Sequence, residues 1–229
     1  MAASAFNRLN ILERLLEDSR VNPSDEDNRA ITLASAAGHL DIVNRLLKYP
    51  RVDPSDASNS AIAAASESGH LDVVKRLLQD TRVNPGDERN ESIVWASEKG
   101  HLDVVNRLLE DPRVDPSDQD NQAIILASYD GHLDLVKRLL QDPRVNPGDQ
   151  RNKAIIGAIR NNHLNIAELL SQDPRINIAD NYASIIISAR AKAKKLRKGG
   201  NKTEAERYEA IVKIFGKAAV GPNKKGPRK

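Results

Sequence analysis

Short apolar stripes alternate with polar, turn-rich segments along the chain, and this alternation returns every 31 residues. Between residues 102 and 110 the apolar side chains fall on one face of an expected α-helix, namely Leu102, Val105, Leu108 and Leu109. A first helix is predicted from Asn90, whose side-chain oxygen would cap it, to about Lys99, before Gly100 ends it. The prolines of the following DPRVDPSD segment exclude helix and suit turns. Each repeat is therefore predicted to be helix, tight turn, helix and extended loop.

Several residue types keep the same 31-residue step at once. The step joins all the histidines of the chain, which are His39, His70, His101, His132 and His163. It also joins a series of asparagines, which are Asn28, Asn59, Asn90, Asn121 and Asn152. A fixed period of this length indicates a stacked repeat array, in which each repeat packs on its neighbours. We expect the recurring residues to serve the stack and the variable ones to serve recognition.

The recurring text AS-x-x-GHLDVV-x-RLL, followed by V-D/N-P, resembles the ankyrin repeat, whose pattern reads AA-x-x-GH-x-x-VV-x-LLL and then VNA. The resemblance covers residues 1 to about 190. It implies an all-α, ankyrin-like helix-turn-helix solenoid that binds a protein partner. The TPLH segment of the family is absent, and the repeat is shorter than the usual length of about 33 residues. This shortened form is similar to arrays that are abundant in giant DNA viruses and protists.

The 31-residue period also predicts where each repeat and each terminal segment begins and ends. Residues 1–27 align with the second half of a repeat, and residues 181–220 are expected to form a partial repeat with basic, helical C-terminal caps, before a basic tail at 221–229. Five repeats lie between them, at 28–58, 59–89, 90–120, 121–151 and 152–180. In the last helix, Thr203 and Glu206 match a capping box. One apolar face of that helix should cover the array, through Tyr208, Ile211, Val212 and Phe215.

Composition narrows the class of protein. The chain has no cysteine, which excludes disulfides and thiol chemistry. No signal-like start and no membrane-length apolar run is present, so we expect no membrane association and an intracellular, cytoplasmic protein, with a nuclear or virion-associated location as the alternative. The net charge of +3 conceals an asymmetry, since residues 181–229 carry 14 Lys and Arg against 3 Asp and Glu. The preceding residues are net acidic.

The histidines carry no expected chemistry. Packed helices lie about 8–10 Å apart, so equivalent histidines of successive repeats cannot share an ion with bonds of about 2 Å. Each is expected to tie its own turn to the neighbouring loop. The chain also lacks a phosphate-binding glycine loop and a paired histidine motif. We therefore predict no enzyme activity, no catalytic residue, no metal and no cofactor.

The variable positions of the first helices are the candidate partner-binding residues. In ankyrin proteins the positions that match the two free residues of AS-x-x-G face the concave groove, and the only tryptophan of the chain lies at a variable position about one turn before them. Aromatic residues at the centre of a surface are typical interface anchors. The candidates are Trp95, Glu98, Lys99, Tyr129, Asp130 and Arg160. An equally weighted alternative for Trp95 is that it fills a gap between repeats.

The basic C-terminal region leaves three interpretations open. It could be a solvated helix, a nuclear-targeting or nucleic-acid-binding segment, or a site for an acidic protein partner, including another copy of the chain. Its basic patch consists of Arg190, Lys192, Lys194, Lys195, Arg197 and Lys198. At the other end, the half repeat carries Ile11, Leu12, Leu15 and Leu16 under little cover. This predicts a monomer, or weak self-association through that edge.

Overall fold

The structure of the chain is a computed structural model, and it describes residues 2–5, 7–176 and 182–219. The described residues form helices and turns without a strand. The predicted boundary near residue 180 and the basic tail at 221–229 lie outside the described residues. Contacts divide the chain into two compact units, residues 1–119 and 120–229.

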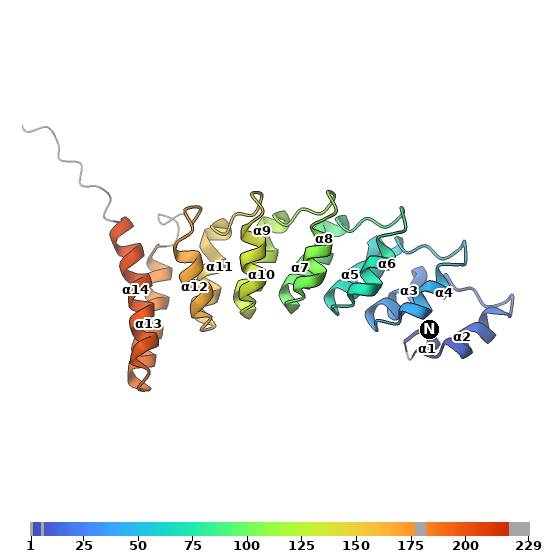
Figure 1. Cartoon of the computed structure of the whole chain (residues 1–229), viewed down its shortest axis with the longest axis horizontal. Coiled ribbons are helices and arrows are strands. Elements are labelled where there is room, and N and C mark those ends of the chain that lie inside the picture. The colour runs from blue at the N-terminus through green and yellow to red at the C-terminus, as the bar shows by residue number, and fades with distance from the viewer. Residues whose placement is uncertain (1, 6, 177–181, 220–229) are drawn as a thin grey trace, which may run out of the picture. The chain divides into compact units, whose positions relative to one another are not determined.

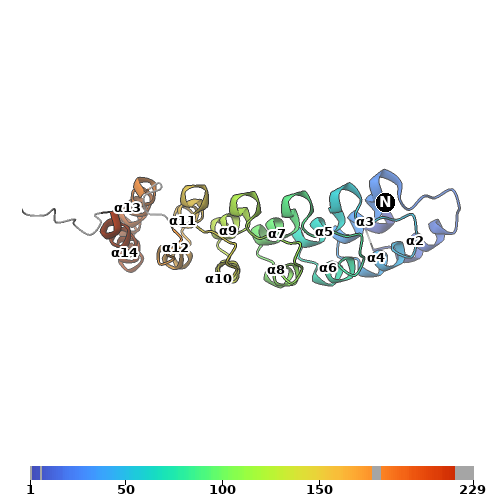
Figure 2. The ribbon, with the colours of Figure 1, turned by 90° about the horizontal axis from the view of Figure 1, so that it is seen from above.

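The first unit consists of paired helices. Their bounds are α1 (Ala2–Ala5), α2 (Leu9–Leu16), α3 (Asp25–Ala36), α4 (Leu40–Leu46), α5 (Asp56–Glu67), α6 (Leu71–Leu77), α7 (Asp87–Lys99) and α8 (Leu102–Leu108). The first helices of the repeats, α3, α5 and α7, pack side by side, and the second helices, α4, α6 and α8, form the other layer (Figures 1 and 2). We call the layer of first helices the first-helix layer.

The second unit continues the same pairing. Helix α9 (Asp118–Asp130) begins in the last residues of the first unit, and the helices that follow are α10 (Leu133–Leu140), α11 (Asp149–Arg160), α12 (Leu164–Ser171), α13 (Tyr182–Lys198) and α14 (Lys202–Ala219). Helix α13 packs on α11 and α14 packs on α12. Figure 1 shows α13 and α14 reaching beyond the ends of α11 and α12. The described helices confirm the predicted all-α repeat solenoid with a helical C-terminal cap.

The core of each repeat is a thin apolar layer. In α8 the buried residues are Val104, Val105 and Leu108, while Leu102 and Leu109 are half-buried. The buried face of α8 is therefore turned by part of a helical turn from the apolar face that the sequence predicted. A valine is also buried in the loops that follow α4, α6, α8 and α10, at Val52, Val83, Val114 and Val145, whereas the equivalent Val21 of the first loop is exposed.

The predicted role of the repeated asparagine as a helix cap is wrong. Glu88, Arg89 and Asn90 have φ values of 43°, 57° and 63°, which place all three in the left-handed region ahead of the right-handed helix. The buried Asn90 side chain reaches the following loop, where Oδ1 accepts from the backbone N–H of Asp115 at 2.7 Å, and the start of the next first helix α9, where Nδ2 donates to Asp118 Oδ2 at 3.0 Å. The same two bonds recur at Asn28, Asn59 and Asn121. This asparagine therefore links successive first helices instead of capping one.

The repeated Gly-His pair also belongs to the stack. His70 Nε2 donates to the carbonyl of Ala36 at 3.1 Å, and His101 Nε2 donates to that of Glu67 at 3.0 Å. Each acceptor is the last residue of the first helix in the preceding repeat, so the predicted structural role is confirmed there, with a helix end as partner in place of a loop. A Cβ on Gly38, which has a φ of 71°, would lie 2.6 Å from the His70 ring. Glycine is thus needed there for its conformation and for its size.

The C-terminal cap begins differently from the prediction. Helix α14 starts at Lys202, and Asn201 Oδ1 accepts from the backbone N–H of Glu204 at 3.2 Å. The predicted capping box at Thr203 and Glu206 is therefore wrong, because the helix has already begun. The apolar face is as predicted for Tyr208, Ile211 and Phe215, which are fully buried, whereas Val212 is half-buried.

Candidate protein-binding surface

In the first unit the candidate residues lie at the end of α7. Trp95 and Glu98 are half-buried and Lys99 is exposed. Trp95 and Glu98 are three residues apart, so they share a face of the helix. Lys99 Nζ donates to Glu98 Oε1 at 2.8 Å. The structure therefore brings these three residues together at one edge of the first-helix layer, with part of the indole exposed.

In the second unit the candidates lie on α9 and α11. Tyr129 is 51% exposed, and both Asp130 and Arg160 are exposed. Tyr129 lies against Gly157 of the next first helix, since a Cβ built on this glycine would be 3.5 Å from Tyr129 Cδ2. Gly157 holds the position that Trp95 holds in its repeat. The contact places the exposed tyrosine next to a position without a side chain.

The sequence interpretation missed one residue of this surface. Helix α13 continues the variable positions of the first helices with a step of 30 residues, which takes Gly157 to Ile187 and Arg160 to Arg190. Ile187 is 67% exposed, and Arg190 is exposed as well. The predicted bounds of the fifth repeat, 152–180, imply a step of 29 residues and point to the buried Ile186 instead, which hid the match. A step of 30 residues, which places Ile185, Ile186 and Ala189 at buried positions, would have found Ile187.

The two units differ in the charge of their first-helix layers. Across the variable positions of the first unit, Glu67, Glu91 and Glu98 outnumber Arg29 and Lys99. In the second unit the charged residues at those positions are Asp130, Lys153, Arg160 and Arg190. The surface of the second unit is therefore basic, and that of the first is slightly acidic.

The basic patch follows α13 to its end. Arg190, Lys194, Lys195, Arg197 and Lys198 are exposed and Lys192 is half-buried. Arg197 also pairs with Glu209 of α14 at 2.9 Å. Because α13 runs eight residues past Arg190, where the matching helix α11 ends at Arg160, most of the patch stands on this extension. A hollow of about 340 Å³ lies beside it, lined by Asn162, Lys192, Lys195, Leu196, Gly199 and Asn201.

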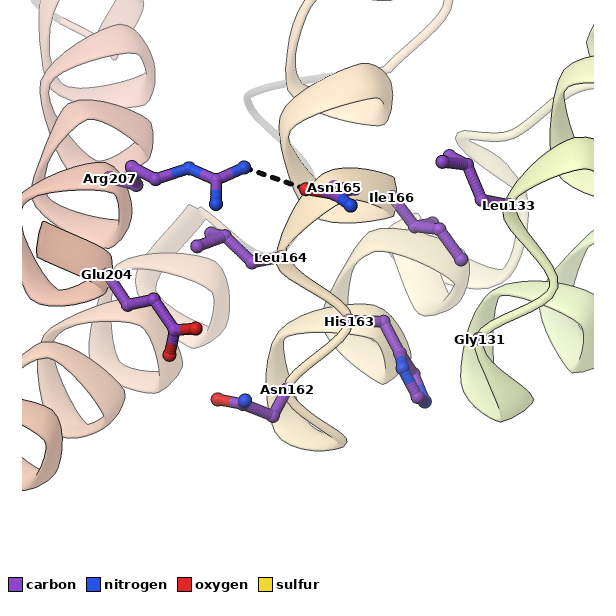
Figure 3. A pocket seen from close by; sticks show the side chains of 9 residues that line it. All are labelled: Gly131, Leu133, Asn162, His163, Leu164, Asn165, Ile166, Glu204 and Arg207. Carbon is purple, nitrogen blue, oxygen red and sulfur yellow. Dashed lines mark hydrogen bonds between the residues drawn. The ribbon is translucent and has the colours of Figure 1, made fainter. Parts of the chain in front are cut away.

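A second hollow, of about 270 Å³, lies along the junction between the last repeat and the cap (Figure 3). Its polar groups mostly serve packing. Arg207 donates to Asn165 Oδ1 at 2.7 Å and to the carboxylate of Glu168, and the ring of His163 packs against Gly131. Next to it, burial raises the pKa of Tyr208 to about 12. The residues that line this hollow therefore belong to the contact between the cap and the last repeat. No two of them are arranged for acid–base chemistry.

Two further features of the described residues bear on the kind of site. No group of three or more His, Cys, Asp or Glu in that part of the chain is placed to hold a metal ion. None of its helices is both long enough and apolar enough to cross a membrane. The exposed surface of the first-helix layer and the basic extension are the features that remain as candidate sites.

The family follows from comparison with known proteins. A family profile described as ankyrin repeats (3 copies) matches residues 1–87 and 93–180, which is well over half of the chain. The chain therefore belongs to the ankyrin repeat family. Repeats of this family are in general protein-interaction modules, and they are typically not enzymes. No curated protein matches the chain.

Proposed function

We propose that the chain is a non-catalytic protein–protein interaction scaffold that binds its partner through the first-helix layer, the concave side in ankyrin proteins. One observation carries the proposal. The asparagine and histidine that recur in every repeat are buried or bonded to a neighbouring repeat, as Asn90 and His101 are, whereas exposed positions such as Tyr129 vary from repeat to repeat. A constant scaffold with a variable surface is the arrangement of a recognition module.

The mechanism is rigid presentation. The variable side chains stand on helices whose backbone is already fixed by bonds between repeats, so binding orders little of the chain. Half-exposed aromatic residues such as Trp95 and Tyr129 supply large contact areas with few rotatable bonds. The charged residues Glu98, Lys99, Asp130 and Arg160 would select the partner and its orientation.

Affinity capture from the native cell tests the proposal, with the full chain as bait. The double variant Tyr129→Ala with Glu98→Lys should lose its protein partners while its thermal unfolding stays nearly unchanged. Asp72→Lys, on an exposed position of the second helix α6, is the control and should keep them. A partner set that is identical for all three baits would exclude the first-helix layer as the site.

A second candidate function rests on the exposed cations of α13. There the chain would be a nucleic-acid- or assembly-associated structural protein, such as a ribonucleoprotein or virion component, anchored by its basic C-terminal region. Binding would be phosphate contact without base readout, so its affinity would fall steeply with salt. Nuclease treatment during the capture separates the two functions, because only the second predicts partners that leave with the nucleic acid.

The state of assembly is a further part of the proposal. In α2, Ile11 and Leu15 are exposed while Leu12 is buried, and a hollow of about 280 Å³ lies beside them. We propose a monomer that self-associates weakly through this edge. Sedimentation at increasing concentration should show association for the native chain and a loss of it for Ile11→Ser with Leu15→Ser.

A further inference from the structure

We propose that the first-helix layer of the second unit binds an acidic protein segment whose apolar side chain sits between Tyr129 and Ile187. This inference rests on the proposed function and adds the chemistry of the partner. We call the surface the C-terminal face, defined by Tyr129, Asp130, Lys153, Gly157, Arg160, Ile187, Arg190 and Lys194.

The apolar centre of the C-terminal face comes from three successive first helices. Tyr129 contacts Gly157, and Ile187 holds on α13 the position that Gly157 holds on α11, which packs beside it. Tyr129 and Ile187 are 51% and 67% exposed. Large side chains so exposed, on either side of a position without one, leave apolar surface that a ligand side chain can cover.

Gly157 is buried, and Tyr129 of the preceding first helix covers it. A Cβ there would meet Tyr129 Cδ2 at 3.5 Å, which is ordinary van der Waals contact, and the glycine lies inside a right-handed helix. Glycine at such a site costs about 0.5–1 kcal/mol relative to alanine. The other repeats place Leu33, Ala64, Trp95 and Leu126 at this position. A side chain larger than that of alanine would meet the Tyr129 ring, so the glycine lets Tyr129 lie against α11 as part of the apolar centre.

Cations surround this apolar centre. Lys153 and Arg160 lie about one helical turn before and after Gly157, and Arg190 and Lys194 lie one and two turns after Ile187. All four are exposed. Exposed charges contribute little affinity each and are screened by salt, but they set partner choice and orientation. The complementary ligand carries carboxylates about one turn to either side of an apolar side chain.

A protein segment fits this face better than a nucleic acid does. Phosphate binding needs cations and gains from aromatic stacking, but it gives no role to the aliphatic Ile187. The apolar pair and the flanking cations together describe an acidic peptide with an apolar anchor.

Selection from a random peptide library on the full chain tests the proposal. The selected peptides should share an apolar residue flanked by Asp or Glu. Their affinity should fall at least about tenfold for Tyr129→Ala with Ile187→Ser, and by a similar factor for Arg160→Glu with Arg190→Glu. It should also weaken when the ionic strength rises from about 0.05 to 0.3 M.

The second helix of the cap supplies matched controls in the same unit. Ile214 and Lys213 of α14 are exposed side chains of the same types, so Ile214→Ser and Lys213→Glu should leave the affinity unchanged. Thermal unfolding of every variant shows whether the fold is retained. Gly157→Leu provides an independent variant, because its side chain would displace the Tyr129 ring and should weaken binding without removing a charge.

The remaining outcomes separate this inference from the proposed function. Peptides that depend on Trp95 and Glu98, but not on the C-terminal face, would overturn the inference and keep the proposed function. Peptides insensitive to every variant of the first-helix layer would overturn both. Displacement by a single-stranded oligonucleotide of equal charge, with no dependence on Tyr129 or Ile187, would show a polyanion surface and overturn the inference.

Discussion

Arg207 of α14 donates two hydrogen bonds to the carboxylate of Glu168 of α12, from Nε to Oε1 at 2.8 Å and from Nη2 to Oε2 at 2.6 Å. A similar contact joins two ordinary repeats, since Arg76 Nε donates to Asn44 Oδ1 of the preceding repeat at 2.7 Å. Glu168 and Asn44 occupy the same position of their second helices. The cap therefore docks by reusing a contact that joins ordinary repeats, strengthened by charge.

We expect Glu168→Lys to loosen the cap. The substitution restores the residue found at this position in two other repeats, Lys75 and Lys137, and it places two cations together. Since both partners are about one-third exposed, the lost bidentate pair costs about 1 kcal/mol after screening by solvent. Hydrogen exchange should show faster opening of α14. The exposed Glu206→Lys is the control, and Glu168→Arg with Arg207→Glu should restore protection; equal protection in all variants would contradict the role of the pair.

The asparagine of each repeat should be the costliest single truncation in the loops. Asn90→Ala removes the two hydrogen bonds that tie the start of α7 to the following loop and to α9, and it leaves the Asp115 N–H without its acceptor. Because this side chain is buried, we expect a loss of about 2–4 kcal/mol in the free energy of unfolding, measured by urea denaturation. Asn10→Ala, at an exposed position of α2, should change it by less than about 0.5 kcal/mol. Comparable small losses for both would refute the bridging role.

The role of this asparagine is a feature that the sequence alone did not predict correctly. The period and the apolar spacing predicted the helices, their order and the glycine turns, because those features depend on contacts near in sequence. The bridge from Asn90 to Asp115 and Asp118 depends on how one repeat meets the next, so local spacing suggested a helix cap. The variable positions named Tyr129 and Arg160 as candidates, but Ile187 was missed because the last loop changes length. Local sequence patterns therefore predicted the helices of each repeat, whereas the contacts between repeats were found only in the structure.

The left-handed residues before each first helix should carry measurable strain. Ala57 has φ and ψ of 47° and 47° and is exposed, and a Cβ makes this conformation unfavourable by roughly 1–2 kcal/mol. Ala57→Gly removes that strain, so we expect the free energy of unfolding to rise by about 0.5–1 kcal/mol. Ala63→Gly, inside the right-handed part of α5, should lower it by about 1 kcal/mol. Opposite signs in urea denaturation support the assignment, and a loss at both positions would contradict it.

The loop aspartates should give the array an acid-sensitive stability. Hydrogen bonds from the side chain of Arg113 lower the pKa of Asp111 below its ordinary value of 3.8, and Arg82 and Arg144 do the same for Asp80 and Asp142. Arg113 also donates to the carbonyl of Val83 in the preceding loop at 2.9 Å, so the ionised pair holds two repeats together.

The direction of the pH dependence follows from the lowered pKa values. Above pH 3.8 the aspartates are ionised in both states and their full contribution is present; as the pH falls through the lower folded pKa values, the unfolded chain has already bound protons and the contribution is lost. Urea denaturation between about pH 7 and pH 2.5 should therefore show a decline confined to the acid end. Asp111→Asn should lower stability near neutral pH by about 1 kcal/mol and make the decline shallower, because one titrating pair is gone. Asp72→Asn, at an exposed position of α6, should retain the native slope; an equally steep decline for Asp111→Asn would show that the acid sensitivity arises elsewhere.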